Sequence, residues 1–287
     1  MDNTALSKEQ LTDLKLKANK ARELTIRMLW KAGSGHTGGS LGMADIFTSF
    51  NFHILRQDPK NPDWDDRDRL ILSNGHICPI RYAVMAMSGY FPEDELETLR
   101  KLDSRLQGHP HRGSLPGLET TSGPLGEGLS QAIGIALAGK LNNKTYHTYV
   151  ISSDGEHEEG NIWEAAMFAG KNKLSNITQI IDRNNIQIDG FTEDVMPLEP
   201  LKDKYLSFGW EVLETDGNDI LMFIDTVIKA KSIVEKPVCI IAHTVAGKGI
   251  SFMENRFEWH GKTPNQNEAE TALYELGAIR EKISKDV

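Results

Sequence analysis

Two hydrophobic runs, each followed at once by a polar segment, constrain the fold of this chain most strongly. The run 146–151 leads into Ser152-Ser-Asp-Gly-Glu-His-Glu-Glu-Gly160, and the run 176–181 leads into Asp182-Arg-Asn-Asn-Ile186. β-branched residues dominate both runs, and the first also carries tyrosines, which is typical of buried strands. Asp154 and Asn184 therefore follow the carboxyl ends of two strands, where open α/β sheets bind their ligands.

The residue types at these strand ends predict a magnesium and diphosphate site. Asp154 and Asn184 offer carboxylate and amide oxygens, which Mg²⁺ prefers, and phosphate oxygens complete its coordination. Gly155 leaves room for a diphosphate beside the backbone, and a helix that starts near Glu159 presents its positive N-terminus nearby. Each residue alone is equally typical of an ordinary turn or cap. The thirty-residue spacing and the helical run 160–166 favour the binding site.

The order of the elements predicts an α/β fold in which a parallel sheet is flanked by helices. Helical patterns cover 8–31, 41–55 and 129–141. Because no linker, internal repeat or low-complexity tract divides the chain, we interpret residues 1–287 as a single domain. The candidate strands are 69–73, 146–152, 176–182, 210–215 and 237–243.

Composition excludes several classes of protein. No apolar run approaches the roughly 20 residues that span a bilayer, and the N-terminus lacks a signal-peptide core, so we expect a cytoplasmic protein without a membrane partner. The net charge of −9 argues against binding to nucleic acid. Cys78 and Cys239 are too far apart in the sequence to indicate a disulfide framework or a zinc site.

Loops that contain glycine and histidine mark further candidate sites. Gly33-Ser-Gly-His-Thr-Gly38 matches the dinucleotide pattern, but it follows a helical segment and not the strand that this pattern requires. His76 follows a predicted strand, where its imidazole can donate to a diphosphate or a sugar. The loop 108–128 is long, as functional loops often are. Its end, Gly123-Pro-Leu-Gly126, is otherwise a simple turn before a helix.

Taken together, these segments resemble the transketolase family of thiamine diphosphate enzymes. They occur in the family's order between His36 and Gly261. The sequence departs from the pattern at Ser153, where the family usually has glycine. The matching segments are Gly35-His36-x-Gly38, Leu72-Ser-x-Gly-His76, Gly108-His109-Pro110, Gly123-Pro-Leu125-Gly126, Asp154-Gly155 with Asn184-Asn185, and Trp259-His260-Gly261.

The resemblance implies a thiamine diphosphate-binding fold of the diphosphate-binding type and a role for each matching residue. It implies that His36, His109 and His260 act in catalysis, the first two on the sugar. Mg²⁺, for which Ca²⁺ or Mn²⁺ can substitute, is expected on Asp154, Asn184 and the carbonyl of Ile186. The cofactor is expected to contact His76, Gly123, Leu125, Asp154, Gly155, Glu159, Asn184 and His260. Glu159 either couples paired sites at a subunit interface or simply favours the helix macrodipole.

The resemblance also implies that a second chain supplies the other half of the enzyme. In this family the glutamate that activates the cofactor belongs to a pyrimidine-binding domain, for which the chain has no room after Gly261. We therefore expect the N-terminal subunit of a split transketolase, completed as α₂β₂ by a chain that carries the pyrimidine-binding and C-terminal domains.

The expected reaction transfers a two-carbon ketol unit from a ketose phosphate to an aldose phosphate, as in the pentose phosphate pathway. Two alternatives remain open at this stage. One is a subunit of another thiamine diphosphate enzyme, which acts on a 2-oxoacid or a different sugar phosphate. The other is a non-catalytic protein that binds thiamine diphosphate.

Overall fold

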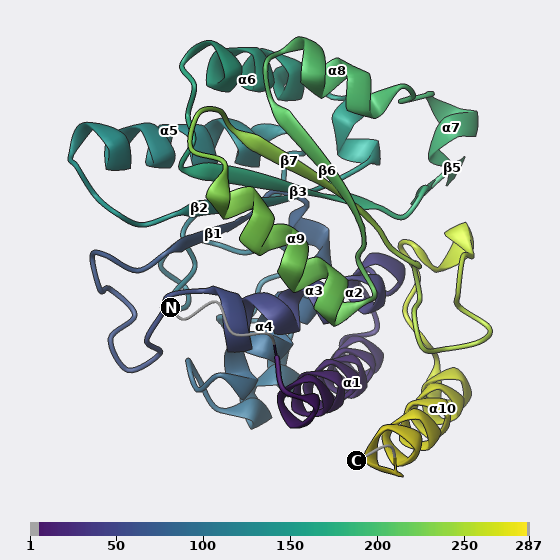
Figure 1. Ribbon diagram of the computed structural model, residues 1–287. Helices are drawn as coiled ribbons and strands as arrows, with labels where there is room; N and C mark the ends of the chain where they lie inside the picture. The colour runs from purple at the N-terminus through teal and green to yellow at the C-terminus, as the bar shows by residue number, and fades with distance from the viewer. Residues whose placement is uncertain (1–5, 286–287) are drawn as a thin grey trace.

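Five parallel strands form the central sheet, in the order β1-β2-β3-β7-β6. A computed structural model describes residues 6–285 (Figure 1). Every residue of β1, β2 and β3 is buried, as is usual for parallel strands that are covered on both faces. Each strand agrees with its predicted range to within two residues. The strands are β1 (Arg69–Leu72), β2 (Thr148–Ser153), β3 (Ile177–Arg183), β6 (Glu211–Asp216) and β7 (Val238–His243).

Helices cover both faces of the sheet (Figure 1). Successive strand residues point to opposite faces, so Ile151 packs into one core and Val150 into the other. One face is covered by α1 (Lys8–Ala32), α3 (Ala44–Ser49), α4 (Cys78–Met87) and α9 (Ile220–Ser232). The other is covered by α5 (Glu127–Leu141), α6 (Gly160–Lys171) and α8 (Leu201–Ser207). The predicted α/β architecture is therefore confirmed.

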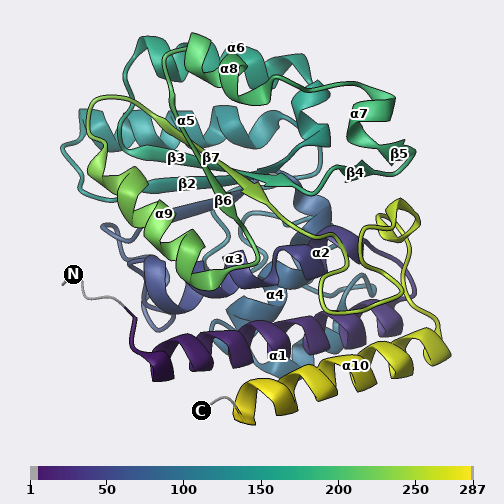
Figure 2. The ribbon, with the colours of Figure 1, turned by 45° about the vertical axis from the view of Figure 1, so that its right-hand side comes forward.

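The helix α10 (Gln266–Lys285) lies along α1, outside the two layers (Figure 2). Leu276 of α10 shares a third hydrophobic cluster with Ile26 of α1 and with Trp259 of the short 3₁₀ turn η5 (Phe257–Trp259). This cluster fixes the segment between β7 and α10 at one end of the sheet. His260 follows η5 directly and is held there.

The sequence prediction differs from the structure in two places. The helix predicted over 41–55 is divided into α2 (Gly38–Gly42), α3 and a π-helical turn η1 (Phe50–Ile54). Residues 186–195 form the antiparallel pair β4 (Ile186–Gln187) and β5 (Gly190–Phe191), followed by the helical turn α7 (Thr192–Val195). These elements are too short for hydrophobic periodicity to reveal them.

The structure also shows the 3₁₀ turns η2 (Gly75–Ile77), η3 (Glu93–Thr98) and η4 (Gly155–Glu158). Two of them, η2 and η4, directly follow β1 and β2. Across residues 6–285, no helix combines the length and the apolar character needed to cross a membrane.

Candidate active site

The carboxyl ends of β1, β2, β3 and β7 bring the predicted site residues together. The strands are parallel and in register, with Ser153 of β2 opposite Asp182 of β3 and Arg183 of β3 opposite His243 of β7. Residues that follow these strands therefore meet at one edge. In the ribbon, β5, α7 and the segment before α10 gather at the same end of the molecule (Figure 1).

A cavity of about 500 Å³ opens at this edge. Nine of the predicted site residues line it: His36, His76, His109, Gly123, Leu125, Gly155, Glu159, Ile186 and His260. The other two, Asp154 and Asn184, are buried beside it. The structure thus places every predicted site residue in or next to one cavity, although the segments that supply them are distributed from residue 36 to residue 260.

Three histidines form a close cluster in this cavity. The ring centroids lie 4.9 Å apart for His36 and His76, 5.6 Å for His36 and His260, and 5.2 Å for His76 and His260. The loops of His36 and His260 are held together because the Thr37 hydroxyl donates to the Lys262 carbonyl at 2.6 Å. The cluster is therefore built from three distant segments of the chain.

Burial keeps these imidazoles neutral. It lowers the pKa of His36 to about 4, with a further contribution from the neighbouring His260, and it lowers the pKa of His76 and of His260 from the usual value of 6.5. Among the described residues, the buried Nδ1 atoms of His36 and His260 have no hydrogen-bond partner. A neutral imidazole offers one donor and one acceptor, so the cluster is free to bind polar groups of a ligand.

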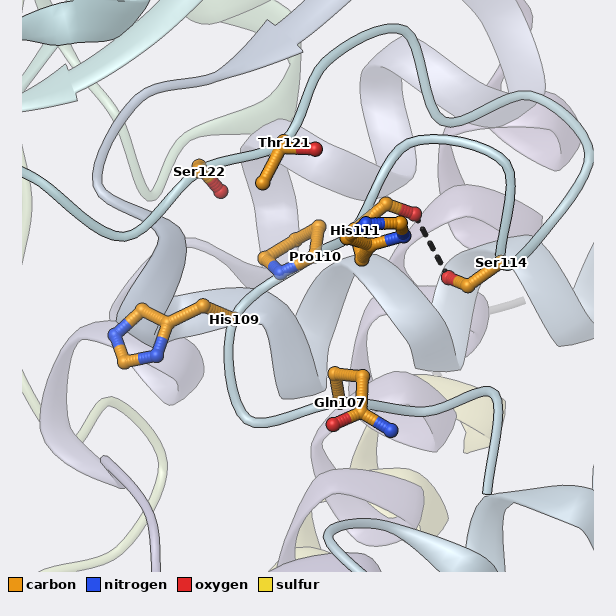
Figure 3. Close-up of a pocket in the computed structure, with 7 residues that line it drawn as sticks. All are labelled: Gln107, His109, Pro110, His111, Ser114, Thr121 and Ser122. Carbon is orange, nitrogen blue, oxygen red and sulfur yellow. Dashed lines mark hydrogen bonds between the residues drawn. The ribbon is translucent and has the colours of Figure 1, made fainter. Parts of the chain in front are cut away.

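His109 connects this cavity to a second one of about 390 Å³ (Figure 3). Its ring points away from the other residues that line the second cavity (Figure 3). Burial, followed by the charge of Arg100, lowers the pKa of His109. His111, for which the sequence predicted no role, lines the second cavity and not the first. The other lining residues are Gln107, Pro110, Ser114, Thr121 and Ser122.

Asp154 joins the ends of β2 and β3. Its Oδ2 accepts from the Asn185 N–H at 2.6 Å and from Arg183 Nη1 at 3.2 Å, and its Oδ1 accepts from the Gly155 N–H at 2.8 Å. Burial raises the pKa of Asp154 to about 6, although Arg183 and the backbone donors act in the opposite direction. The carboxylate is thus fixed in place, and a cation beside it would stabilise its charged form.

Sequence reasoning missed the role of Arg183 at this point. Its Nη2 donates to Glu193 Oε1 at 2.5 Å and to Glu199 Oε1 at 3.0 Å, while Nη1 donates to Asp154. The guanidinium therefore links the end of β2 to the segment that carries α7. Val195 of α7 lines the cavity, so Arg183 also supports a part of the cavity wall.

The orientation of Asn184 suits a metal ligand. Its Nδ2 donates to Asp182 Oδ2 at 2.8 Å, and its Oδ1 accepts from the Ile186 N–H at 3.0 Å, which leaves one lone pair of Oδ1 for a cation. The buried Asp182, whose pKa burial raises to about 7, fixes this orientation.

The donors at this point are all oxygens: the carboxylate of Asp154, the amide of Asn184 and the carbonyl of Ile186. Within residues 6–285 there is no cluster of three or more His, Cys, Asp or Glu side chains that could hold a metal by themselves. This oxygen set fits Mg²⁺, Ca²⁺ or Mn²⁺ better than zinc. Because three protein oxygens leave further coordination positions open, the set also fits a cation that shares a diphosphate.

Close packing explains the glycine at position 155. A Cβ atom there would lie 2.7 Å from Gln187 Oε1, so glycine lets η4 approach the β4–β5 hairpin. Sequence reasoning assigned no role to several other residues of the cavity wall. Only the Asp189-Gly190 turn signal could have predicted the hairpin that carries some of them. These residues are Ser153, Glu156, Glu158, Gln187, Ile188, Asp189 and Val195.

Glu159 occupies the N-cap position of α6 but makes no side-chain cap hydrogen bond. It is exposed at the rim of the cavity. This position is compatible with both of its predicted roles, interaction with the helix macrodipole and contact with a second subunit.

Comparison with protein families identifies the kind of domain. Residues 14–284 match the family model described as the thiamine diphosphate-binding domain of transketolase. Among related proteins, a subunit of the 6-deoxy-6-sulfo-D-fructose transketolase of Clostridium sp. is 41% identical over 93% of this chain and 98% of its own length. One subunit of the apulose-4-phosphate transketolase of Phocaeicola vulgatus is 39% identical over 96% of this chain and 98% of its own.

Solved structures agree with this assignment. The transketolase of Campylobacter jejuni superimposes with a TM-score of 0.87 at 34% identity, and the match covers 94% of this chain and 45% of that one. This chain thus spans about half the length of the solved transketolases that it matches. The fold and the site define a thiamine diphosphate-binding domain, and the chain belongs to the transketolase family.

The resemblance deduced from the sequence is confirmed, including its interpretation as an N-terminal subunit, because the relatives that it matches from end to end are named as subunits. The alternatives, an enzyme acting on 2-oxoacids and a non-catalytic binder, are not favoured.

Proposed function

We propose that this chain is the cofactor-binding subunit of a split transketolase, which transfers a two-carbon ketol unit from a ketose phosphate to an aldose phosphate. One observation carries the proposal. Nine of the residues that the resemblance to transketolases assigns to the site line a single cavity, and the remaining two are buried beside it. The match to the transketolase family along residues 14–284 supports it further.

Asp154, Asn184 and the carbonyl of Ile186 would hold Mg²⁺, and the diphosphate would complete its coordination. Bound thiamine diphosphate supplies the nucleophilic carbon and the electron sink that breakage of a carbon–carbon bond requires. The imidazoles of His76 and His260 face the same cavity and would donate to diphosphate oxygens. Gly123 and Leu125 would contact the cofactor from the turn before α5.

His36 and His109 would bind the sugar. A neutral imidazole can donate to an oxygen that gains charge and accept a proton from a hydroxyl, and both histidines have lowered pKa values. Because His109 also borders the second cavity, a sugar held at this residue can extend from one cavity into the other. His260, whose Nδ1 has no hydrogen-bond partner in the described part of the chain, would assist His36 in proton transfer.

The assembly is part of the same proposal. A partner chain that carries the pyrimidine-binding and C-terminal domains would complete the site, and we propose an α₂β₂ complex in the cytoplasm. The relatives named as subunits support a partner chain. The solved transketolases are about twice as long as this chain, which supports the domains assigned to the partner. Glu159, at the exposed N-terminus of α6, would lie at the contact between subunits.

The sugar is proposed more narrowly as a pentose phosphate pair, with xylulose 5-phosphate as donor and ribose 5-phosphate as acceptor. The two relatives described above are named for a sulfonated ketose and for apulose 4-phosphate. These two sugars are therefore the alternatives that an assay must include.

The proposal is tested by measuring two-carbon transfer to ribose 5-phosphate from xylulose 5-phosphate and from each of the two alternative donors. The assay contains Mg²⁺ and thiamine diphosphate and is run with the chain alone and after addition of the partner chain. We expect activity only in the mixture. In the reconstituted enzyme, His109→Ala should leave cofactor binding intact and lower turnover strongly. Full activity of the chain alone would refute the split-enzyme proposal. Cofactor binding without transfer from any of the three donors would refute the proposed reaction.

A further inference from the structure

Glu156 is a fully buried carboxylate in the wall of the cofactor cavity, with an exposed fraction of 0%. It belongs to η4, directly after Gly155. No transketolase motif in the sequence assigns it a role, and it differs from the other buried acids of this edge because it neither faces Arg183 nor contacts Asn184. Its partners lie in three separate segments of the chain.

The carboxylate of Glu156 joins these segments through hydrogen bonds. Oε1 accepts from the Ser73 hydroxyl and from the Gly126 N–H, the latter at 2.6 Å, and Oε2 accepts from the Ser153 N–H at 3.2 Å. Ser73 Oγ in turn accepts from the Gly128 N–H at 3.0 Å. Through these bonds, one side chain connects the ends of β1 and β2 to the start of α5.

Glu156 thereby replaces the missing N-cap of α5. The first backbone N–H groups of a helix have no partner within the helix, and a polar side chain at the N-cap position usually accepts from them. Here the N-cap residue is Gly126, which has no side chain and a φ of 84°. Glu156 and Ser73 accept from the Gly126 and Gly128 N–H groups instead, and the negative carboxylate also favours the positive end of the helix.

The turn held in this way is part of the cavity wall. Gly123 and Leu125 both face the cavity, and Gly126 follows them directly. The wall therefore depends on a bond between the Gly126 N–H and a residue thirty positions further along the chain. The bonds from Glu156 are also the link between this wall and the end of β2, where Asp154 begins the proposed diphosphate site.

We propose that Glu156 is a positioning residue that holds the Gly123–Gly126 turn against the organic part of thiamine diphosphate. This inference rests on the proposed function. Leu125 is the apolar side chain of the turn that lines the cavity, so it suits the uncharged rings of the cofactor, whereas the diphosphate belongs with the oxygen ligands and histidines. Loss of Glu156 should therefore weaken binding of the whole cofactor more than binding of diphosphate alone.

The test compares Glu156→Ala and Glu156→Gln with the unmodified chain, in the presence of the partner chain. Calorimetry measures the dissociation constants of thiamine diphosphate and of inorganic diphosphate, both with Mg²⁺. Asp68→Ala is the matched control: Asp68 is a buried carboxylate that also accepts two backbone N–H bonds, from Arg56 and His147, but it precedes β1 at the opposite edge of the sheet.

Removal of the carboxylate leaves three buried donors without their acceptor, so Glu156→Ala should raise the dissociation constant of thiamine diphosphate by about tenfold or more. Glutamine keeps an oxygen for Ser73 and Gly126 but turns an amide N–H₂ toward the Ser153 N–H. We expect it to recover affinity to within about threefold of the unmodified chain. The dissociation constant of inorganic diphosphate should change by less than about threefold in both variants. Asp68→Ala should change neither dissociation constant.

Hydrogen exchange gives a readout that does not depend on the cofactor. The Gly126 and Gly128 amides should exchange slowly in the unmodified chain and about tenfold faster or more in Glu156→Ala. Unchanged cofactor affinity in that variant would overturn the inference, as would an equal loss of both ligands. If the unmodified chain bound no thiamine diphosphate, both the proposed function and this inference would be refuted. Slow exchange of the Gly126 amide would in that case show that Glu156 only caps α5.

Discussion

Replacement of Asp154 by asparagine should separate the stability of this protein from its ability to bind the cofactor. The carboxylate is fully buried, and burial raises its pKa from 3.8 to about 6. In the metal-free protein the carboxylate is charged at neutral pH, but burial makes this charge less favourable than in the unfolded chain, in spite of Arg183. Asparagine has nearly the same shape and carries no charge. Arg183 keeps Glu193 and Glu199 as partners in the variant, so no unpaired buried cation results.

The magnitude follows from the two pKa values. Because the pKa of Asp154 is higher in the folded than in the unfolded protein, its contribution to the free energy of unfolding falls as pH rises through the range between them. A shift of about two pKa units lowers the free energy of unfolding by about 3 kcal/mol at pH 7.5 and by about 1 kcal/mol at pH 4.5. Asparagine does not titrate. The difference in unfolding free energy, variant minus unmodified protein, should therefore increase by about 2 kcal/mol between these pH values.

Urea unfolding followed by tryptophan fluorescence measures this difference at both pH values without metal. A second series at pH 7.5 adds Mg²⁺ and thiamine diphosphate at 100 times the dissociation constant of the unmodified protein. Such an excess stabilises a binding protein by about 2.7 kcal/mol, and the variant should gain almost nothing. A difference that does not change with pH would refute the argument from burial. Equal stabilisation of the variant by the ligands would refute Asp154 as a metal ligand.

Two further substitutions test the structure around the site. Burial lowers the pKa of His157 to about 4, so its stabilising contribution is complete above pH 6.5 and decreases as pH falls toward 4. His157→Asn should therefore reduce the acid-induced loss of unfolding free energy by about 2.5 kcal/mol at pH 4.5, and an unchanged pH profile would contradict this. Gly126→Ala should lower stability by about 2 kcal/mol or more, because φ is 84° and the new Cβ would lie 2.0 Å from Asn161 Oδ1. Gly134 lies within α5, and a Cβ atom there would have no atom of the described residues within 4 Å, so Gly134→Ala should be neutral or stabilising. Thermal denaturation compares the two variants, and equal losses would exclude the steric explanation.

The sheet and the position of the site were predictable because they depend on local sequence. Strands that are buried on both faces, such as β3, leave a run rich in β-branched residues, and the polar segment after the run marks the carboxyl edge. Asp154 and Asn184 could be placed in this way without knowledge of the sheet order. The histidines could not. Their convergence from residues 36, 76 and 260 depends on how separate loops pack, so only resemblance to a known family indicated it.

The roles of Arg183 and Glu156 could not be predicted because they depend on residues that lie elsewhere in the sequence. Arg183 lies between Asp182 and Asn184 in the sequence, and nothing in that segment predicts its contacts with Glu193 and Glu199. Glu156 acquires its role only when the Gly126 turn, which cannot cap its own helix, meets the end of β2.

The charges around the cavity explain why it suits a cation and a diphosphate together. Arg183 pairs with Asp154, the three clustered histidines are neutral, and the carboxylates of Glu158, Glu159 and Asp189 line the rest of the cavity. A cation alone would compete with Arg183 for Asp154, and a diphosphate alone would meet neutral imidazoles. Bound together, each ligand offsets the charge of the other, and the diphosphate can also accept from or donate through the buried Nδ1 of His260, for which residues 6–285 provide no hydrogen-bond partner. The cavity is therefore matched to the pair of ligands, and its affinity for either one alone should be low.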